Sequence, residues 1–123
     1  MRAFVLALGL ILGPTLGLTL APTLALAETI TPSETRQHVG QSVTVEGVVT
    51  AVNTTDRSDV TFLDMGGRYP NNLFTAVIVK NDADKFPNVG TLEGKTIDVT
   101  GTIKLYKGRP GIILTDAAQI KLK

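Results

Sequence analysis

Cysteine and tryptophan are absent from the 123-residue sequence, and histidine occurs once. The absence of cysteine excludes disulfide bonds, thiol catalysis and thiolate metal sites. The single histidine, His38, has no base, nucleophile or second metal ligand near it. Asp56, Asp59 and Asp64 carry oxygen atoms of the kind that bind Ca²⁺, but their spacing matches no cation-binding loop. Asp64 is expected in a strand, on one face with Phe62, and solvated turn residues are the better interpretation of the set. We therefore expect no enzyme, with no catalytic residue, no metal site and no cofactor.

An excess of charge of either sign is also missing, because 12 basic side chains face 11 acidic ones and the formal net charge is +1. Strong, nonspecific binders of nucleic acid are usually more basic than this. The charges are nevertheless unevenly spread, since residues 94–123 hold six basic and two acidic side chains. This part of the chain could present a positive stripe to an anion, and an ordinary mixed surface is the alternative.

The first 27 residues have the pattern of a signal peptide. Arg2 gives a short positive start, an apolar run begins at Ala3, and the segment ends in Ala25-Leu26-Ala27. Small residues three and one positions before a cut are those that signal peptidase accepts. We predict cleavage after Ala27, a mature domain of residues 28–123, and an exported, periplasmic or secreted protein without membrane attachment. The alternative is an uncleaved transmembrane anchor, since the apolar stretch is about long enough to span a bilayer.

Two short helices are expected in the mature part. Thr31 is a good helix cap, Pro32 suits the first helical position, and Glu34 can complete a capping box, so a helix should run from there to about residue 38. Asn81 can cap a second helical turn, which Pro87 ends.

Alternation of β-branched and polar residues predicts five strands, at 42–53, 60–65, 73–80, 95–106 and 109–115. Residues 66–72 are dense in turn formers and form a loop, and Lys107-Gly108 makes a tight hairpin. Ile120 and Leu122 extend the pairing at the end. The core faces of the two long strands are expected to be Val43, Val45, Gly47, Val49 and Ala51 in the first, and Ile97, Val99, Gly101 and Ile103 in the fourth.

The two long strands each carry a glycine near the middle. Gly47 and Gly101 are expected to let the strands bend or bulge, so that one strand serves two parts of a curled sheet. Five such strands, with a helix between the third and the fourth, predict an all-β, five-stranded OB-type barrel; a small sandwich is the alternative. The helix favours the barrel because it would plug the open end.

Three stretches of the mature part carry a resemblance to a known kind of domain. They are His38–Gln41 with the alternating Val43–Val49, then Arg68–Ile78, and then Gly94–Ile103 with Tyr106–Ile112. Together they resemble bacterial exported OB-fold domains of the nucleic-acid-binding type. The resemblance covers nearly all of the mature part, and it implies an OB fold and, more loosely, binding of nucleic acid. Similar domains occur as small exported proteins, some beside secreted nuclease domains.

A binding face is expected on the second and third strands and the neighbouring loops, because OB folds bind oligonucleotides there. Single strands are held by aromatic faces that stack bases and by cations that follow phosphates. Phe62 and Phe74 are alternatively core residues, and the basic hairpin is alternatively a solvated turn. The candidate nucleic-acid-binding residues are Arg57, Phe62, Arg68, Tyr69, Phe74, Lys80, Tyr106, Lys107 and Arg109.

Three functions remain open from the sequence. The first is a non-enzymatic module that binds single-stranded DNA or RNA weakly and without sequence preference. The second is a protein or peptide interaction module with an envelope protein as partner. The third is an OB protein for a small ligand or envelope stress. Only two tyrosines are candidates for exposed rings, and each stacked base contributes about 1–3 kcal/mol, so weak affinity is expected in the first case.

Overall fold

The computed structural model describes residues 27–123. The predicted signal segment 1–27 therefore lies outside the described residues, apart from Ala27. Within the described range, no helix combines the length and the apolar character that crossing a bilayer requires.

The described part consists of eight short or medium strands and four 3-10 helices. All five predicted strands are present, with the fourth divided in two at Ile103, and the short β1 was not predicted. The elements are β1 (Glu28–Ile30), η3 (Pro32–His38), β2 (Ser42–Thr54), β3 (Thr61–Met65), β4 (Phe74–Ile78), η4 (Lys80–Lys85), η5 (Val89–Leu92), β5 (Thr96–Thr102), β6 (Lys104–Tyr106), β7 (Arg109–Ile113), η6 (Ala117–Gln119) and β8 (Ile120–Leu122).

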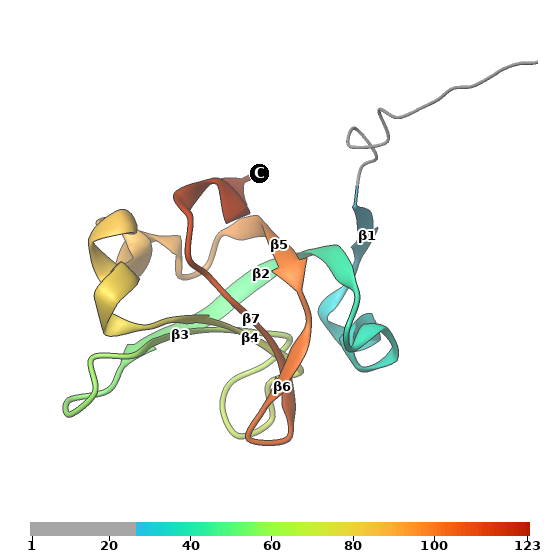
Figure 1. Cartoon of the computed structure of the whole chain (residues 1–123), viewed down its shortest axis with the longest axis horizontal. Coiled ribbons are helices and arrows are strands. Elements are labelled where there is room, and N and C mark those ends of the chain that lie inside the picture. Colours follow the sequence, from blue (N-terminus) through green and yellow to red (C-terminus); the bar gives the residue numbers. More distant parts are fainter. Residues whose placement is uncertain (1–26) are drawn as a thin grey trace, which may run out of the picture.

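The strands form one open sheet in the order β6-β7-β4-β3-β2-β5-β8, with β1 beside β2. The expected closed barrel of five strands is therefore wrong in strand number and in closure. β2 does serve two parts of the sheet, since residues 42–48 pair with β5 and residues 49–54 pair with β3. Because only Ile103 separates β5 from β6, the sheet curls back on itself, as Figure 1 shows.

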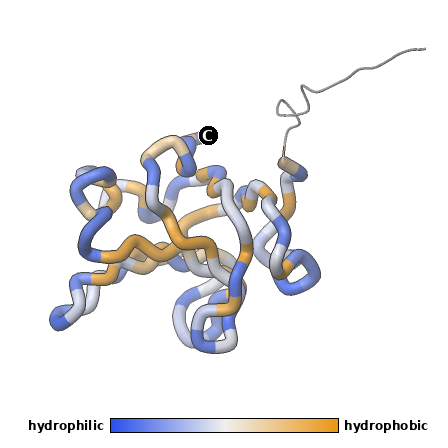
Figure 2. Tube along the Cα trace, viewed as in Figure 1, coloured by the Kyte–Doolittle hydropathy of each residue, from blue (hydrophilic) through white to orange (hydrophobic). Residues whose placement is uncertain are grey.

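The predicted core faces are confirmed except at Ala51. Val43, Val45 and Val49 of β2 are buried in the core, whereas Val48, on the other face, is 47% exposed. Ala51 follows an irregularity in β2 and lies opposite Asp64, so it is buried on the other face of the sheet, and Val52 packs against the core in its place. Strand side chains alternate between the two faces of a sheet, so a period of two in the sequence becomes one apolar layer. Figure 2 shows this apolar character along the central strands, with hydrophilic loops around them. The fourth strand contributes Ile97, Val99 and Ile103, all fully buried.

The two central glycines lie in strands as predicted, but the reason for each is a close approach and not a bulge. A Cβ atom at Gly47 would lie 2.9 Å from Cγ of Pro32, and a Cβ at Gly101 would lie 2.6 Å from Cγ2 of Ile112. The irregularity in β2 falls between Val49 and Ala51 instead. Gly47 thus lets η3 pack closely on β2, and Gly101 lets β7 approach β5 across the open side of the curled sheet.

The open seam of the sheet lies between β5 and β7, which contact each other but are not neighbours in the pairing order. The side chain of Gln119 spans this seam. Its Nε2 donates to the carbonyl oxygens of Thr100 at 2.9 Å and Ile113 at 3.4 Å, and its Oε1 accepts from the backbone N–H of Thr115 at 2.8 Å. Backbone polar groups that would otherwise lack strand partners are thereby satisfied.

The helices differ in detail from the sequence expectation. The capping box is present, because the backbone N–H of Thr31 donates to Oε1 of Glu34 at 2.8 Å. The second helix begins at Lys80, with Val79 and not Asn81 in the capping position, and a further turn, η5, follows it. Both remain between β4 and β5, where one helix was predicted.

Candidate functional site

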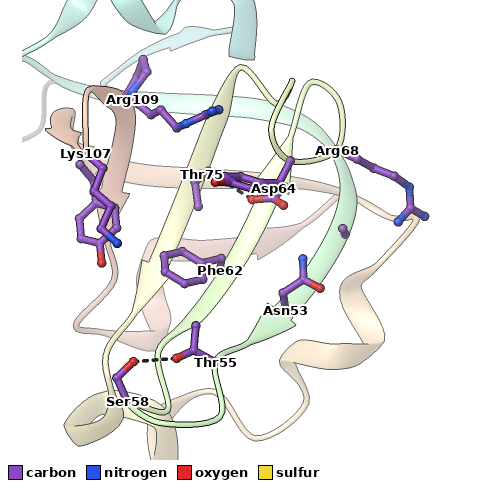
Figure 3. A pocket seen from close by; sticks show the side chains of 13 residues that line it. Asn53, Thr55, Ser58, Phe62, Asp64, Arg68, Thr75, Lys107 and Arg109 are labelled. Atoms are coloured by element: carbon purple, nitrogen blue, oxygen red, sulfur yellow. Dashed lines mark hydrogen bonds between the residues drawn. The ribbon is translucent and has the colours of Figure 1, made fainter.

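A pocket of about 800 Å³ opens over β2, β3 and β4. It is bordered by the β2–β3 loop, by the β3–β4 loop and by the hairpin between β6 and β7 (Figure 3). The lining residues are Ala51, Asn53, Thr55, Ser58, Phe62, Asp64, Arg68, Tyr69, Thr75, Tyr106, Lys107, Arg109 and Pro110.

An aromatic wall comes from two distant parts of the chain. Phe62 is on β3, where its neighbour Leu63 is fully buried and points to the core, so Phe62 points to the other face. Tyr106 ends β6, and its ring centroid lies 5.9 Å from that of Phe62 with the planes tilted by 49°. Tilted pairs at this distance are favourable for the ring quadrupoles. Nζ of Lys107 lies 5.8 Å from the Tyr106 centroid, which adds a cation beside the wall.

Arg109 ties the hairpin to the β3–β4 loop. Its Nη1 donates to the carbonyl oxygen of Pro70 at 2.7 Å and to Oδ1 of Asn72 at 3.2 Å. The guanidinium carbon lies 5.0 Å from the ring centroid of Tyr69, within the range of a cation–π contact. The two loops consequently lie side by side, as their neighbouring positions in Figure 1 also show.

The hairpin can be this tight because Lys107 and Gly108 both have positive φ, of 52° and 81°. Two successive residues in that region form the type of turn that matches the twist of paired strands. The turn brings Tyr106 and Arg109 directly opposite each other in the β6–β7 ladder. The ring of Tyr106 and the guanidinium group of Arg109 therefore extend from the paired ends of β6 and β7.

The floor of the pocket is formed by Asp64, which is only 3% exposed. Its Oδ1 accepts from Oγ1 of Thr75 at 3.3 Å and from Nδ2 of Asn72 at 3.4 Å. Burial raises the pKa of Asp64, while hydrogen bonds from Thr75 and from the backbone of Tyr69, together with the charge of Arg109, act in the opposite direction. The prediction of a solvated residue is therefore wrong for Asp64, although its place in a strand is confirmed. The prediction holds for Asp56 and Asp59, which are exposed.

Six of the nine candidate residues from the sequence line this one pocket. Of the other three, Phe74 is fully buried in the core, so its ring offers no face to a ligand. Arg57 is exposed and outside the lining set, and Nζ of Lys80 lies 3.7 Å from a carboxylate oxygen of Asp59. The six that the structure brings together are Phe62, Arg68, Tyr69, Tyr106, Lys107 and Arg109.

Sequence reasoning missed five polar lining residues, Asn53, Thr55, Ser58, Asp64 and Thr75. One signal was available for Asp64, because it stands two positions after Phe62 in the same strand and must share its face. Alternation could not identify Asn53, because it placed Ala51 on the core face, and the irregularity in β2 turns both residues toward the pocket. No comparable pattern marks Thr75, whose whole strand is buried.

Charges of opposite sign lie at different depths in the pocket. Arg68, Lys107 and Arg109 form a cationic rim, and the carboxylate of Asp64 lies at the floor between them. Tyr69 is 71% exposed and Tyr106 is 37% exposed, so both rings are accessible at the pocket edge. In OB folds, oligonucleotides and oligosaccharides bind on this face of the second and third barrel strands, which correspond to β3 and β4 here, and on the loops at its ends. The fold and the position of the pocket define an OB-type module.

Comparison with known proteins agrees on the fold. No protein-family model matches the chain, and no curated protein matches it. Among solved structures, it is similar to a chain named as an aspartyl-tRNA synthetase from Leishmania major Friedlin, with 11% identity, a TM-score of 0.53, and coverage of 87% of this chain and 22% of that one. It is also similar to the aspartyl-tRNA synthetase from Entamoeba histolytica, with 16% identity, a TM-score of 0.54, and coverage of 85% and 22%.

The chain thus spans about a fifth of the length of each of these solved proteins. At these identities the likeness concerns the fold alone. It supports an OB-type domain.

Proposed function

We propose that this domain binds single-stranded nucleic acid in the pocket over β2, β3 and β4, weakly, largely without sequence preference and without catalysing a reaction. The observation that carries the proposal is the meeting of accessible aromatic rings and cations around one pocket. Tyr69 and Tyr106 offer ring faces on which bases can stack. Arg68, Lys107 and Arg109 offer positive charge along which a phosphate backbone can run.

The fold gives the proposal independent support. The pocket occupies the face that OB domains use for oligonucleotides. The two similar solved proteins are, by name, synthetases that act on a tRNA, so an OB-type domain of this shape occurs within proteins that handle nucleic acid.

The test is fluorescence anisotropy with a short labelled single strand across a salt series. Binding should weaken steeply as salt rises, because phosphate contacts release counterions. The charge reversals Arg68→Glu and Lys107→Glu, made together, should abolish binding. Both side chains are exposed and neither holds the β3–β4 loop to the hairpin, so the fold should be unaffected.

A matched control uses two exposed lysines that do not line the pocket, Lys95 and Lys121. Reversing both changes the net charge by the same amount as the pocket pair. Affinity should be largely retained in this control. Equal losses in the two double variants would show only a general charge effect, and absence of binding by the wild type at low salt would end the proposal.

One observation favours a second candidate, a peptide-binding module. β6 stands at one end of the pairing order, and its Leu105 is 54% exposed. An exposed strand edge can pair with an extended peptide through backbone hydrogen bonds. Binding of this kind should depend little on salt and should be weakened by Leu105→Lys, which leaves the pocket unchanged.

We also propose that the protein is exported with cleavage after Ala27. Mass spectrometry of the protein recovered from the exported fraction should then show Glu28 as the first residue. A full-length mass in the membrane fraction would favour the uncleaved anchor.

A further inference from the structure

The carboxylate at the floor of the pocket is out of keeping with a site that only follows phosphates. A negative charge among the rim cations would repel a sugar-phosphate backbone that came close to it. Asp64 is 3% exposed, so only a group that enters the pocket fully can reach it. In a nucleic-acid strand, the part that can do so is a base, because the phosphates must stay beside the cations at the rim.

The carboxylate is held in a fixed position with acceptor capacity to spare. Thr75 and Asn72 both donate to Oδ1, neither engages Oδ2, and the backbone N–H of Tyr69 is one further donor to the carboxylate. Asn72 also donates to Oγ1 of Thr75 at 2.6 Å, which orients that hydroxyl toward the carboxylate. An ionised carboxylate has about four lone-pair sites on its two oxygens, so hydrogen bonds from a ligand can be added to those already made.

An aromatic face lies next to this acceptor. Phe62 is two residues before Asp64 on β3, and both side chains line the same pocket. Figure 3 shows Asp64 and Thr75 together in the middle of the pocket with the Phe62 ring beside them. A base that stacks on this ring can therefore turn one edge toward the carboxylate.

The chemistry of the base edges selects among the four bases. Guanine carries two neighbouring donors, N1–H and the N2 amino group, which match the two oxygens of a carboxylate in a paired hydrogen bond. Adenine and cytosine each offer one amino group beside an acceptor, and thymine offers one N–H between two carbonyl groups. An acceptor next to a carboxylate is repelled, so these three bases fit less well.

We propose that the pocket floor is a base subsite that prefers guanine, with Asp64 as the acceptor and Phe62 as the stacking ring. The inference rests on the proposed binding of single strands and deepens it: the rim holds any strand, and the floor favours one base at one position. A paired hydrogen bond of this kind discriminates between bases by about tenfold.

The experiment compares labelled thymidine heptamers that differ only at the central position, which is guanine, hypoxanthine, adenine or cytosine. One guanine per strand avoids self-association. The guanine heptamer should bind about tenfold more tightly than the adenine and cytosine heptamers. The hypoxanthine heptamer, which keeps N1–H and lacks the N2 amino group, should fall between them.

Asp64→Asn should remove the guanine preference while the strand continues to bind, because the amide can still accept from Thr75 but presents a donor to the base. Asp56→Asn, in the exposed β2–β3 loop, is the matched control and should keep the preference. The comparison of the four heptamers on the wild type needs no variant, so a folding defect in Asp64→Asn would not hide the answer.

The outcomes separate this inference from the function on which it rests. If no heptamer binds the wild type at low salt, the proposed function fails together with the subsite. If all four bind equally, the guanine subsite is wrong and strand binding stands. If guanine is preferred and Asp64→Asn keeps that preference, Asp64 is not the acceptor and the assignment is wrong.

Discussion

Gly101→Ala tests how the curled sheet is held at its open seam. Gly101 is on β5, where a Cβ atom would lie 2.6 Å from Cγ2 of Ile112 on β7 and 3.0 Å from Nε2 of Gln119. Both neighbours belong to the seam between β5 and β7. The added methyl group must therefore push β7 outward or displace the Gln119 amide from its carbonyl partners.

The expected cost follows from the size of the overlap. Carbon atoms pack best at about 3.5–4.0 Å, so the new contact is too short by about 1 Å. Overpacking of a filled interior costs about 1–3 kcal/mol. Each kcal/mol lowers the melting temperature of a domain of this size by about 4–8 °C. Gly101→Ala should therefore lower the melting temperature by at least several degrees.

The assay is urea and thermal unfolding followed by circular dichroism, with Gly90→Ala as the control. Gly90 has no heavy atom within 4 Å of an added Cβ, and its φ is not in the left-handed region. The control should be neutral or slightly stabilising, because alanine restricts the unfolded chain. If Gly101→Ala is as stable as the wild type, then the seam is not packed as described and the glycine is not there for close approach.

Three further predictions concern the pocket. Burial raises the pKa of Asp64, so the ionised carboxylate destabilises the folded state at pH values above its folded-state pKa. Asp64→Asn should therefore raise the free energy of unfolding at neutral pH. Urea titrations should show that this gain disappears below about pH 4, where the carboxyl is protonated in both states. Lys107→Met should leave the melting temperature unchanged and make the slope of log K against log salt shallower by about 0.7, one phosphate contact, while an unchanged slope would place Lys107 outside the strand path. Phe74→Ala should cost about 3–5 kcal/mol in unfolding experiments, whereas the half-buried Phe62→Ala should lose mainly oligonucleotide affinity, and a reversed pattern would exchange their roles.

The positions of the strands could be predicted because the signal is local. Alternation over a few residues fixes which side chains share a face, and this was enough for the core face of β5 and for that of β2 as far as Val49, where an irregularity shifts the pattern. The different fates of Phe62 and Phe74 could not be predicted in this way. Phe74 is opposite Met65 in the β3–β4 ladder, so its burial follows from the register of two strands across a loop. No short-range pattern in either strand carries that information.

The burial of Asp64 has a similar non-local cause. The β3–β4 loop lies over one end of the pocket because Arg109, 39 residues beyond Pro70, holds its backbone. The departure from a closed barrel also depends on a contact outside the strand pattern, since the Gln119 side chain occupies the seam where a ladder between β5 and β7 would close the sheet. No periodic pattern of residues in the sequence indicates either contact.

The near-zero net charge of the chain understates the field at the pocket. Ion pairs among the described residues use Lys80, Lys85 and Lys123, each of which faces an acidic partner within 4 Å. The rim cations take part in none of these pairs. Charges separated by more than a Debye length, about 8 Å at physiological salt, are largely screened from one another. A nucleic-acid strand at the pocket therefore meets the local cluster of cations, and four of the 11 acidic residues in the composition, Glu46, Asp59, Asp82 and Asp98, lie in ion pairs of their own.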